Sequence, residues 1–324
     1  MTIEQLSLFP DQPPRAVELQ GNLTAESSLD RAMERFRDHM IQQEYAENTV
    51  KSFLGDLGIL KRYLKGNPPV GQISTKSLQD FMRWLQYERG KPCSPKSYAR
   101  RLTTLKVFFG WLAGLGVLPA DPAAPLVHKP VMAPLPRILY DDQVDQVLAV
   151  TRQMMAGEGP DKKPDPRPHL LVTLLLETGI KKQECMGIKL AHIDTSNPSD
   201  PVVHIRYDNP RMHYKERRLR LPAAWSRALA LYRQVYQPQQ ILFPCTPRNL
   251  EYVLAAVAKL AGLPDGLSFE MLRWTCAVRD YRAHMDPDQL RRKLGLSQMS
   301  WQETEPKLVR LIAPPLGEEE GTRP

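Results

Sequence analysis

Two adjacent lysines, Lys181 and Lys182, follow a tight junction between two apolar segments. The stretch LLLETGIKKQECMGIKLAHID begins as a buried helix, turns at Thr178–Gly179, and continues as a second helix that leads to a strand. A cationic pair at such a turn can hold an anionic group such as a phosphate. It can also be the solvated start of a helix.

Basic residues recur in two further places. In SPKSYARRLTTLK, helical spacing puts Lys96, Arg100 and Thr104 on one side of a helix, with Arg101 beside them. Residues 205–220 contain six basic and two acidic residues on an alternating pattern typical of a hairpin. Either cluster can bind a polyanion or be an ordinary solvated face. On the hairpin strand, Arg217 can equally form salt bridges to local acids.

Composition limits the chemistry further. The 324-residue chain has a net charge of +8, four scattered cysteines without a C-x-x-C pair, and seven histidines without metal-ligand spacing. We therefore expect neither a metal nor a cofactor. There is no apolar run of the roughly 18–20 residues that span a bilayer. The N-terminus also lacks the pattern of a secretory signal, so we expect no membrane association and a cytoplasmic location.

The elements that must position these residues fall into two regions. Residues 1–27 lack periodicity and read as a flexible tail. Residues 28–118 predict four amphipathic helices in one compact domain, beginning near Leu29, Asn48, Ser74 and Ser94, with Asn48 as an N-cap. Six prolines mark residues 119–137 as a linker.

Residues 138–312 predict a second, mixed domain. A helix is followed by a polar loop, the opening stretch, a small antiparallel hairpin, and helices at about 222–237, 247–262, 269–284 and 286–295. Residues 313–324 read as an acidic tail, and the short apolar run Leu308–Ile312 could dock on a neighbouring copy. The predicted fold class is mainly α with a small β-sheet, in a helical domain plus an α+β domain.

The order of motifs resembles the tyrosine recombinases, the family of phage integrases and the Xer group. ENTVKSFLGDLGIL and SPKSYARRLTTLKVFFGWL resemble their helical, SAM-like core-binding domain. LLETGIKKQECMGIKLAHID, YKERRLRLP and EMLRWTCAVRDYRAHMDPDQLRRKLGLSQMS resemble three motifs of their catalytic domain. The resemblance implies phosphoryl transfer at DNA, in which a tyrosine hydroxyl attacks the scissile phosphate while arginines, a lysine and histidines assist.

Carried over residue by residue, that active site is mostly substituted. The first arginine falls on Lys181, the first histidine on Glu270, and the later histidine on Leu296, whereas the second arginine is kept as Arg273. The hairpin lysine is either Lys215 or a position three residues earlier, where Met212 lies beside Arg211.

The nucleophile position falls near Glu305, and no tyrosine follows Tyr281 in the chain. Ser297, Ser300 and Thr304 lie near that position, but nothing in the neighbouring sequence would activate a hydroxyl. We therefore expect an integrase-like protein that binds double-stranded DNA, alone or as a homo-oligomer, and lacks catalytic activity.

The residues that we expect to contact DNA are Thr49, Lys51, Lys96, Arg100, Arg101, Thr104, Lys181, Arg211, Lys215, Arg218, Arg220 and Arg273. Two alternatives stay open. One is an active but divergent strand transferase with another nucleophile. The other is a scaffold or accessory protein that has lost DNA binding.

The tail contains EQLSLFP, in which Gln5, Leu6, Leu8 and Phe9 resemble the pentapeptide that docks bacterial DNA-handling proteins on the replication sliding clamp. The same residues could instead pack on their own domain or on a partner protomer.

Overall fold

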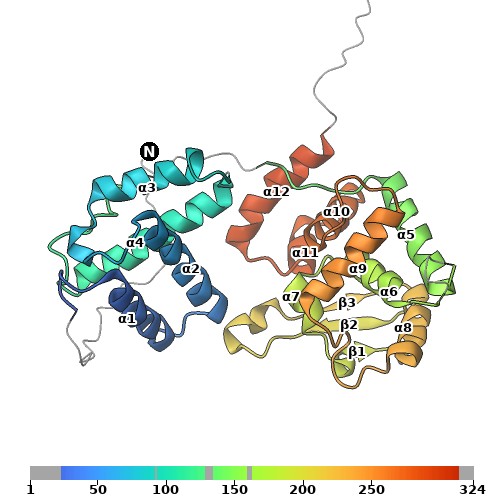
Figure 1. Ribbon diagram of the computed structural model, residues 1–324. Coiled ribbons are helices and arrows are strands. Elements are labelled where there is room, and N and C mark those ends of the chain that lie inside the picture. Colours follow the sequence, from blue (N-terminus) through green and yellow to red (C-terminus); the bar gives the residue numbers. More distant parts are fainter. Residues whose placement is uncertain (1–22, 92, 128–133, 159–162, 314–324) are drawn as a thin grey trace, which may run out of the picture. The chain divides into compact units, whose positions relative to one another are not determined.

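The computed structural model describes residues 23–91, 93–127, 134–158 and 163–313. The chain divides between residues 133 and 134 into two compact units. The described part of the first unit is helical, and that of the second adds a three-stranded antiparallel sheet to its helices (Figure 1). The predicted fold class, mainly α with a small β-sheet, is confirmed.

The described residues of the first unit form four helices and a 3₁₀ turn around one apolar core. Ser28, Ser74 and Ser94 cap three of the helices by accepting backbone amide hydrogen bonds. The prediction of Asn48 as a cap was wrong, because Asn48 lies inside the second helix, which follows Ala46 without a side-chain cap. The elements are α1 (Leu29–Gln42), α2 (Glu47–Tyr63), η1 (Val70–Gln72), α3 (Thr75–Tyr87) and α4 (Pro95–Gly114).

This unit extends beyond its predicted limits at both ends. Amides of the η1 turn bond the carbonyls of Ala25 and Ser27, so the predicted tail 1–27 includes residues that belong to the domain. Ala123 and Leu126 are buried in the core of the first unit, so part of the predicted linker 119–137 packs there too. Burial of scattered apolar residues, which proline content does not report, explains both differences.

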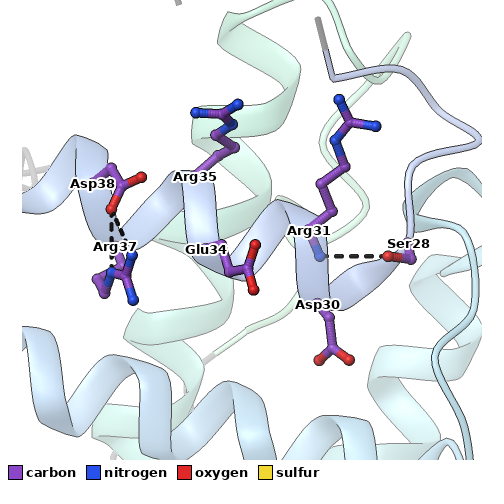
Figure 2. A pocket seen from close by; sticks show the side chains of 7 residues that line it. All are labelled: Ser28, Asp30, Arg31, Glu34, Arg35, Arg37 and Asp38. Carbon is purple, nitrogen blue, oxygen red and sulfur yellow. Dashed lines mark hydrogen bonds and ion pairs between the residues drawn. The ribbon is translucent and has the colours of Figure 1, made fainter. Parts of the chain in front are cut away.

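Helix α1 presents a shallow hollow to solvent (Figure 2). Three arginines and three carboxylates line it, and Arg37 pairs with Asp38 at 3.0 Å. Because the charges balance, this hollow is a poor match for a polyanion.

The second unit surrounds its sheet with helices. Strand β2 pairs with β3 in the register Val203↔Leu219 and Ile205↔Arg217, which confirms the predicted hairpin. The predicted helices are found within about two residues. The elements are α5 (Asp141–Ala156), α6 (Arg167–Thr178), α7 (Lys182–Met186), η2 (Leu190–His192), β1 (Ile193–Asp194), β2 (Val202–Ile205), η3 (Pro210–Lys215), β3 (Arg217–Arg220), α8 (Ala223–Tyr236), α9 (Pro247–Leu260), α10 (Phe269–Arg282), α11 (Pro287–Lys293) and α12 (Gln298–Ile312).

The last helix, α12, packs on its own unit. Trp301 and Leu308 are buried in an apolar cluster that includes residues of α10 and α11. The run Leu308–Ile312, which the sequence offered for docking on a neighbouring copy, therefore contributes to this chain's own core. Among the described residues, no helix has both the length and the apolar character needed to cross a membrane.

Candidate phosphate-binding site

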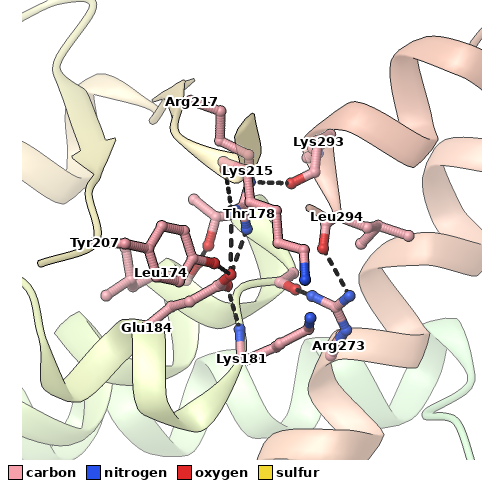
Figure 3. Close-up of polar contacts among 11 residues, drawn as sticks. Leu174, Thr178, Lys181, Glu184, Tyr207, Lys215, Arg217, Arg273, Lys293 and Leu294 are labelled. Atoms are coloured by element: carbon pink, nitrogen blue, oxygen red, sulfur yellow. Dashed lines mark hydrogen bonds and ion pairs between the residues drawn. The ribbon is translucent and has the colours of Figure 1, made fainter. Parts of the chain in front are cut away.

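Three cations from separate elements meet in the second unit. Lys181 immediately precedes α7, Lys215 ends η3, and Arg273 lies in the first half of α10. Figure 3 shows their nitrogen atoms turned toward one another. Burial, followed by the charges of Arg273 and Lys215, lowers the pKa of Lys181. An anion bound between them would relieve this repulsion.

Arg273 is held by two backbone carbonyls. Its Nη1 donates to the Gly179 oxygen, and its Nη2 donates to the Leu294 oxygen at 2.7 Å. Burial lowers the pKa of Arg273 to about 10. Gly179 ends α6 with a positive φ of 59°, and a Cβ there would lie 2.8 Å from a Leu294 methyl carbon. Glycine therefore lets the end of α6 approach closely enough to orient Arg273.

One buried carboxylate, that of Glu184, connects α7 to both sides of the hairpin. It accepts the Lys181 amide at 2.8 Å, two bonds from Arg217 at 2.9 and 3.1 Å, and the Tyr207 hydroxyl (Figure 3). Burial opposes ionisation of Glu184, but its bonds to Arg217 and Tyr207 keep its pKa below the ordinary value. Burial and the bond to Glu184 raise the pKa of Tyr207 to about 12, so this phenol stays protonated.

Arg217 also reaches the end of α11. Its Nε donates to the Lys293 oxygen at 2.7 Å, next to the Leu294 carbonyl that holds Arg273. Carbonyls at a helix C-terminus attract cations. Of the two roles weighed for Arg217 from sequence, the structure shows a salt bridge, but the acid, Glu184, lies 33 residues away and is not local in sequence.

The remaining cationic groups are available to a ligand. The Lys181 ammonium has no hydrogen-bond or salt-bridge acceptor within the described ranges. The Lys215 ammonium has a weak contact to the Met212 sulfur at 4.0 Å and lies 5.1 Å from the centre of the Tyr214 ring. Since Arg217 neutralises Glu184, three positive charges remain. In the parts of the chain that the structure describes, no cluster of His, Cys, Asp or Glu is arranged for a metal ion.

Three further positions were assigned to the active site from the resemblance, and the structure shows what surrounds each of them. Glu270 is exposed in the first turn of α10, where a carboxylate suits the helix dipole. Leu296 packs against the apolar cluster that contains Trp301. Glu305 is partly buried in α12 and directly precedes Pro306, which interrupts the backbone hydrogen bonding of that helix.

The three hydroxyls considered as substitute nucleophiles have local structural roles. Ser297 caps α12 by accepting the Ser300 amide at 3.2 Å, and its hydroxyl bonds that of Ser300. Thr304 donates to the Ser300 carbonyl at 2.7 Å. None of these bonds joins a hydroxyl to a basic side chain, which is the contact that would activate it as a nucleophile.

The residues predicted to bind DNA from the hairpin separate into two groups. Lys215 lies with Lys181 and Arg273 in the cluster of three cations. Arg218 and Arg220 lie on the sheet face opposite Arg217. Arg220 is mostly exposed and lies 3.7 Å from Asp200. Arg211 is exposed on η3.

In the first unit, one of these predictions needs correction. Thr104 is fully buried and bonds Asp56, so its side chain cannot contact DNA in this structure. Arg101 is also largely buried against Asp56. Lys96 and Arg100 are exposed on α4, Thr49 is partly buried, and Lys51 is exposed in a 2.6 Å ion pair with Glu47. Helical spacing predicts that Lys96, Arg100 and Thr104 share one side of a helix, but it does not show which of them the core covers.

Sequence reasoning missed Glu184 and Tyr207. Glu184 had a signal, because an acid three residues after the first residue of a turn is typical of a capping box. Tyr207 had none, since its partner lies 23 residues away. The tail residues Gln5, Leu6, Leu8 and Phe9 lie outside the described residues.

Comparison with known proteins shows which sequences this chain resembles. Residues 33–114 match the phage integrase N-terminal SAM-like domain. Tyrosine recombinase XerC of Mycobacterium leprae is 30% identical over 167 residues, covering 50% of this chain and 54% of that protein. XerC of Mycobacterium tuberculosis is 31% identical over 153 residues, covering 46% and 49%. The chain thus spans about half the length of the curated relatives it matches.

Solved structures show the same fold. The Tn1549 transposon integrase, in complex with a circular intermediate DNA, has a TM-score of 0.67 at 16% identity, covering 88% of this chain and 99% of that one. A lambda integrase dimer bound to a core site has a TM-score of 0.64 at 15% identity, covering 86% and 77%. The fold is therefore that of the integrases. In sequence, the chain is similar to tyrosine recombinases over about half of its length.

Proposed function

We propose that this protein binds duplex DNA during recombination or integration and holds one backbone phosphate between Lys181, Lys215 and Arg273. The observation that carries the proposal is the convergence of these three cations, none of which forms a salt bridge with a carboxylate within the described residues. Arg273 is already oriented by two carbonyls, so little conformational freedom is lost when it binds. The DNA-bound complexes of the Tn1549 and lambda integrases support the same ligand class.

We further propose that the protein does not cleave the strand it holds. The family's nucleophile position carries Glu305, whose carboxylate would repel a phosphate, and the following Pro306 constrains that turn. Tyr207, although near the pocket, directs its hydroxyl into Glu184. Without a nucleophile the pocket can position a phosphodiester but has no covalent step to accelerate.

The proposal that Lys181, Lys215 and Arg273 hold a phosphate is tested by the salt dependence of DNA binding. Lys181→Ala should lower the slope of log affinity against log salt by about one, the value for one lost phosphate contact. Lys182→Ala is the matched control, because its neighbouring ammonium pairs with Glu251 at 2.8 Å. Equal effects of the two variants would show that Lys181 contributes only general charge and that the pocket does not hold a phosphate.

Absence of cleavage is tested on a nicked duplex that traps covalent intermediates. We expect a complex on a native gel that disappears on a denaturing gel. A band that survives denaturation would refute the proposal of inactivity. The linked residue would then be sought first at Tyr214, which is 68% exposed beside Lys215, by comparing Tyr214→Phe with Tyr207→Phe.

Two partner proposals accompany this function. We propose that copies assemble on DNA, as the lambda integrase does in its dimeric and tetrameric complexes. Light scattering with and without duplex tests this directly. We also propose that the segment Gln5–Phe9 docks on the sliding clamp, because paired apolar anchors suit a hydrophobic groove. Unchanged clamp binding after replacement of Gln5, Leu8 and Phe9 by alanine would refute it.

A further inference from the structure

A buried carboxylate in the first unit holds two arginines of α4. Asp56, in α2, is 3% exposed and accepts the Arg100 Nη2 at 2.8 Å. The Arg101 Nε lies 3.4 Å from the same oxygen, and the Thr104 hydroxyl donates to the other oxygen at 3.2 Å. Three positions on α4 thus contact this carboxylate, and Arg100 donates the shortest of these contacts.

The charges in this cluster do not balance. Two arginines face the single carboxylate of Asp56, and one of them, Arg101, is only 11% exposed on its side chain. Arg100 is therefore a surplus cation, and its side chain is 42% exposed. Burial raises the pKa of Asp56 despite both arginines, so keeping this carboxylate inside the unit has a cost. Water could solvate a half-exposed arginine without help. Solvation therefore does not explain why a buried carboxylate holds Arg100.

The anchored guanidinium keeps most of its hydrogen-bonding capacity. Arginine has five N–H donors in a planar fork, and Asp56 accepts from one nitrogen only. No further acceptor for Arg100 is found within the described ranges, so one edge of the fork can meet two acceptors at once. Lys96, Thr103 and Lys106 are exposed on the same side of α4, in place of the buried Thr104.

We propose that Arg100 reads sequence by donating two parallel hydrogen bonds to a guanine, and that Asp56 is its positioning residue. Guanine presents its O6 and N7 acceptors together in the major groove, which is the pair an arginine fork fits best. Lys96 and Lys106, which lack such an anchor, bind phosphate at mobile positions. The inference rests on the proposed DNA binding and adds the base that the first unit selects.

The test uses the full chain and a pool of duplex DNA with a randomised central segment. Wild-type protein should enrich duplexes with guanine at one position of its site. Arg100→Lys keeps the charge but removes the fork, so this guanine preference should fall by roughly 5- to 150-fold, while other selected positions persist. Lysine at this half-exposed position keeps a positive charge beside Asp56, so the fold should tolerate the replacement.

Two further variants separate positioning from stability. Asp56→Asn should relax the same guanine position even though Arg100 is intact. Thr104→Val removes a buried hydrogen bond to Asp56 but leaves the Arg100 contact, so it should lower stability with the base preference unchanged. Lys96→Ala should weaken binding to all sequences alike.

Three outcomes would overturn the inference. If Arg100→Lys weakens all sequences equally, Arg100 is a phosphate contact, and the proposed function stands without this refinement. If wild-type protein binds duplexes without any guanine preference, the inference also fails alone. Absence of DNA binding at low salt would refute the inference and the proposed function together.

Discussion

Replacement of Glu184 by glutamine should strongly destabilise the second unit. The side chains of Glu184 and Arg217 are 2% and 9% exposed, so the pair is shielded from water. Glutamine keeps the shape but leaves the Arg217 guanidinium buried beside Arg273 without a counter-charge. Loss of one partner from a buried pair typically costs about 3–5 kcal/mol. The exposed pair of Lys182 and Glu251 should be worth at most about 1 kcal/mol.

The free energy of unfolding should be measured in urea by hydrogen exchange of peptides from β3 and α10. These peptides report on the second unit separately from the first, which matters because a two-unit chain need not unfold in one step. Glu251→Gln is the matched control for removal of a carboxylate. A second variant, Glu184→Gln with Arg217→Met, removes both charges and should recover much of the loss.

The reasoning would be refuted if Glu184→Gln cost no more than Glu251→Gln. That result would mean that water reaches the pair, so that burial does not set its strength. A double variant less stable than Glu184→Gln would contradict the account differently. It would show that the bond from Arg217 to the Lys293 carbonyl matters more than the unpaired charge.

Two further predictions concern a glycine and a histidine. Gly295→Ala should cost clearly more than Gly262→Ala in urea unfolding, since both have positive φ but only a Cβ at 295 would meet another group, the Arg217 Nη1 at 2.6 Å. Equal costs of about 1–2 kcal/mol would mean that backbone strain alone destabilises both variants. Burial lowers the pKa of His169, which bonds Thr151 at 2.9 Å. The stability that neutral His169 contributes is therefore present above the unfolded pKa of about 6.5 and is lost as pH falls below it. His169→Asn should reduce this loss of stability in acid. Unfolding measured from pH 7 to 5 tests the prediction.

The helical domain could be predicted well because its signals are local. Serine caps and the 3.6-residue spacing of apolar residues act within one or two turns, and α1, α3 and α4 begin where those signals place them. The cap of α2 was misplaced because Asn48 has the right residue type but the wrong position. The domain edges were misplaced because Ala25 and Leu126 pack against residues distant in sequence.

The sequence by itself determined the fold class, the hairpin and most of the helices up to residue 293. Each of these depends on residue type and local spacing. Only the tertiary structure decided which basic side chains are free and which are paired. Arg100 meets an acid 44 residues away and Arg217 one 33 residues away, whereas Lys181 and Lys215 meet none among the described residues. Pairing between distant segments depends on how the elements pack, and a pattern of charges along the chain does not contain that information.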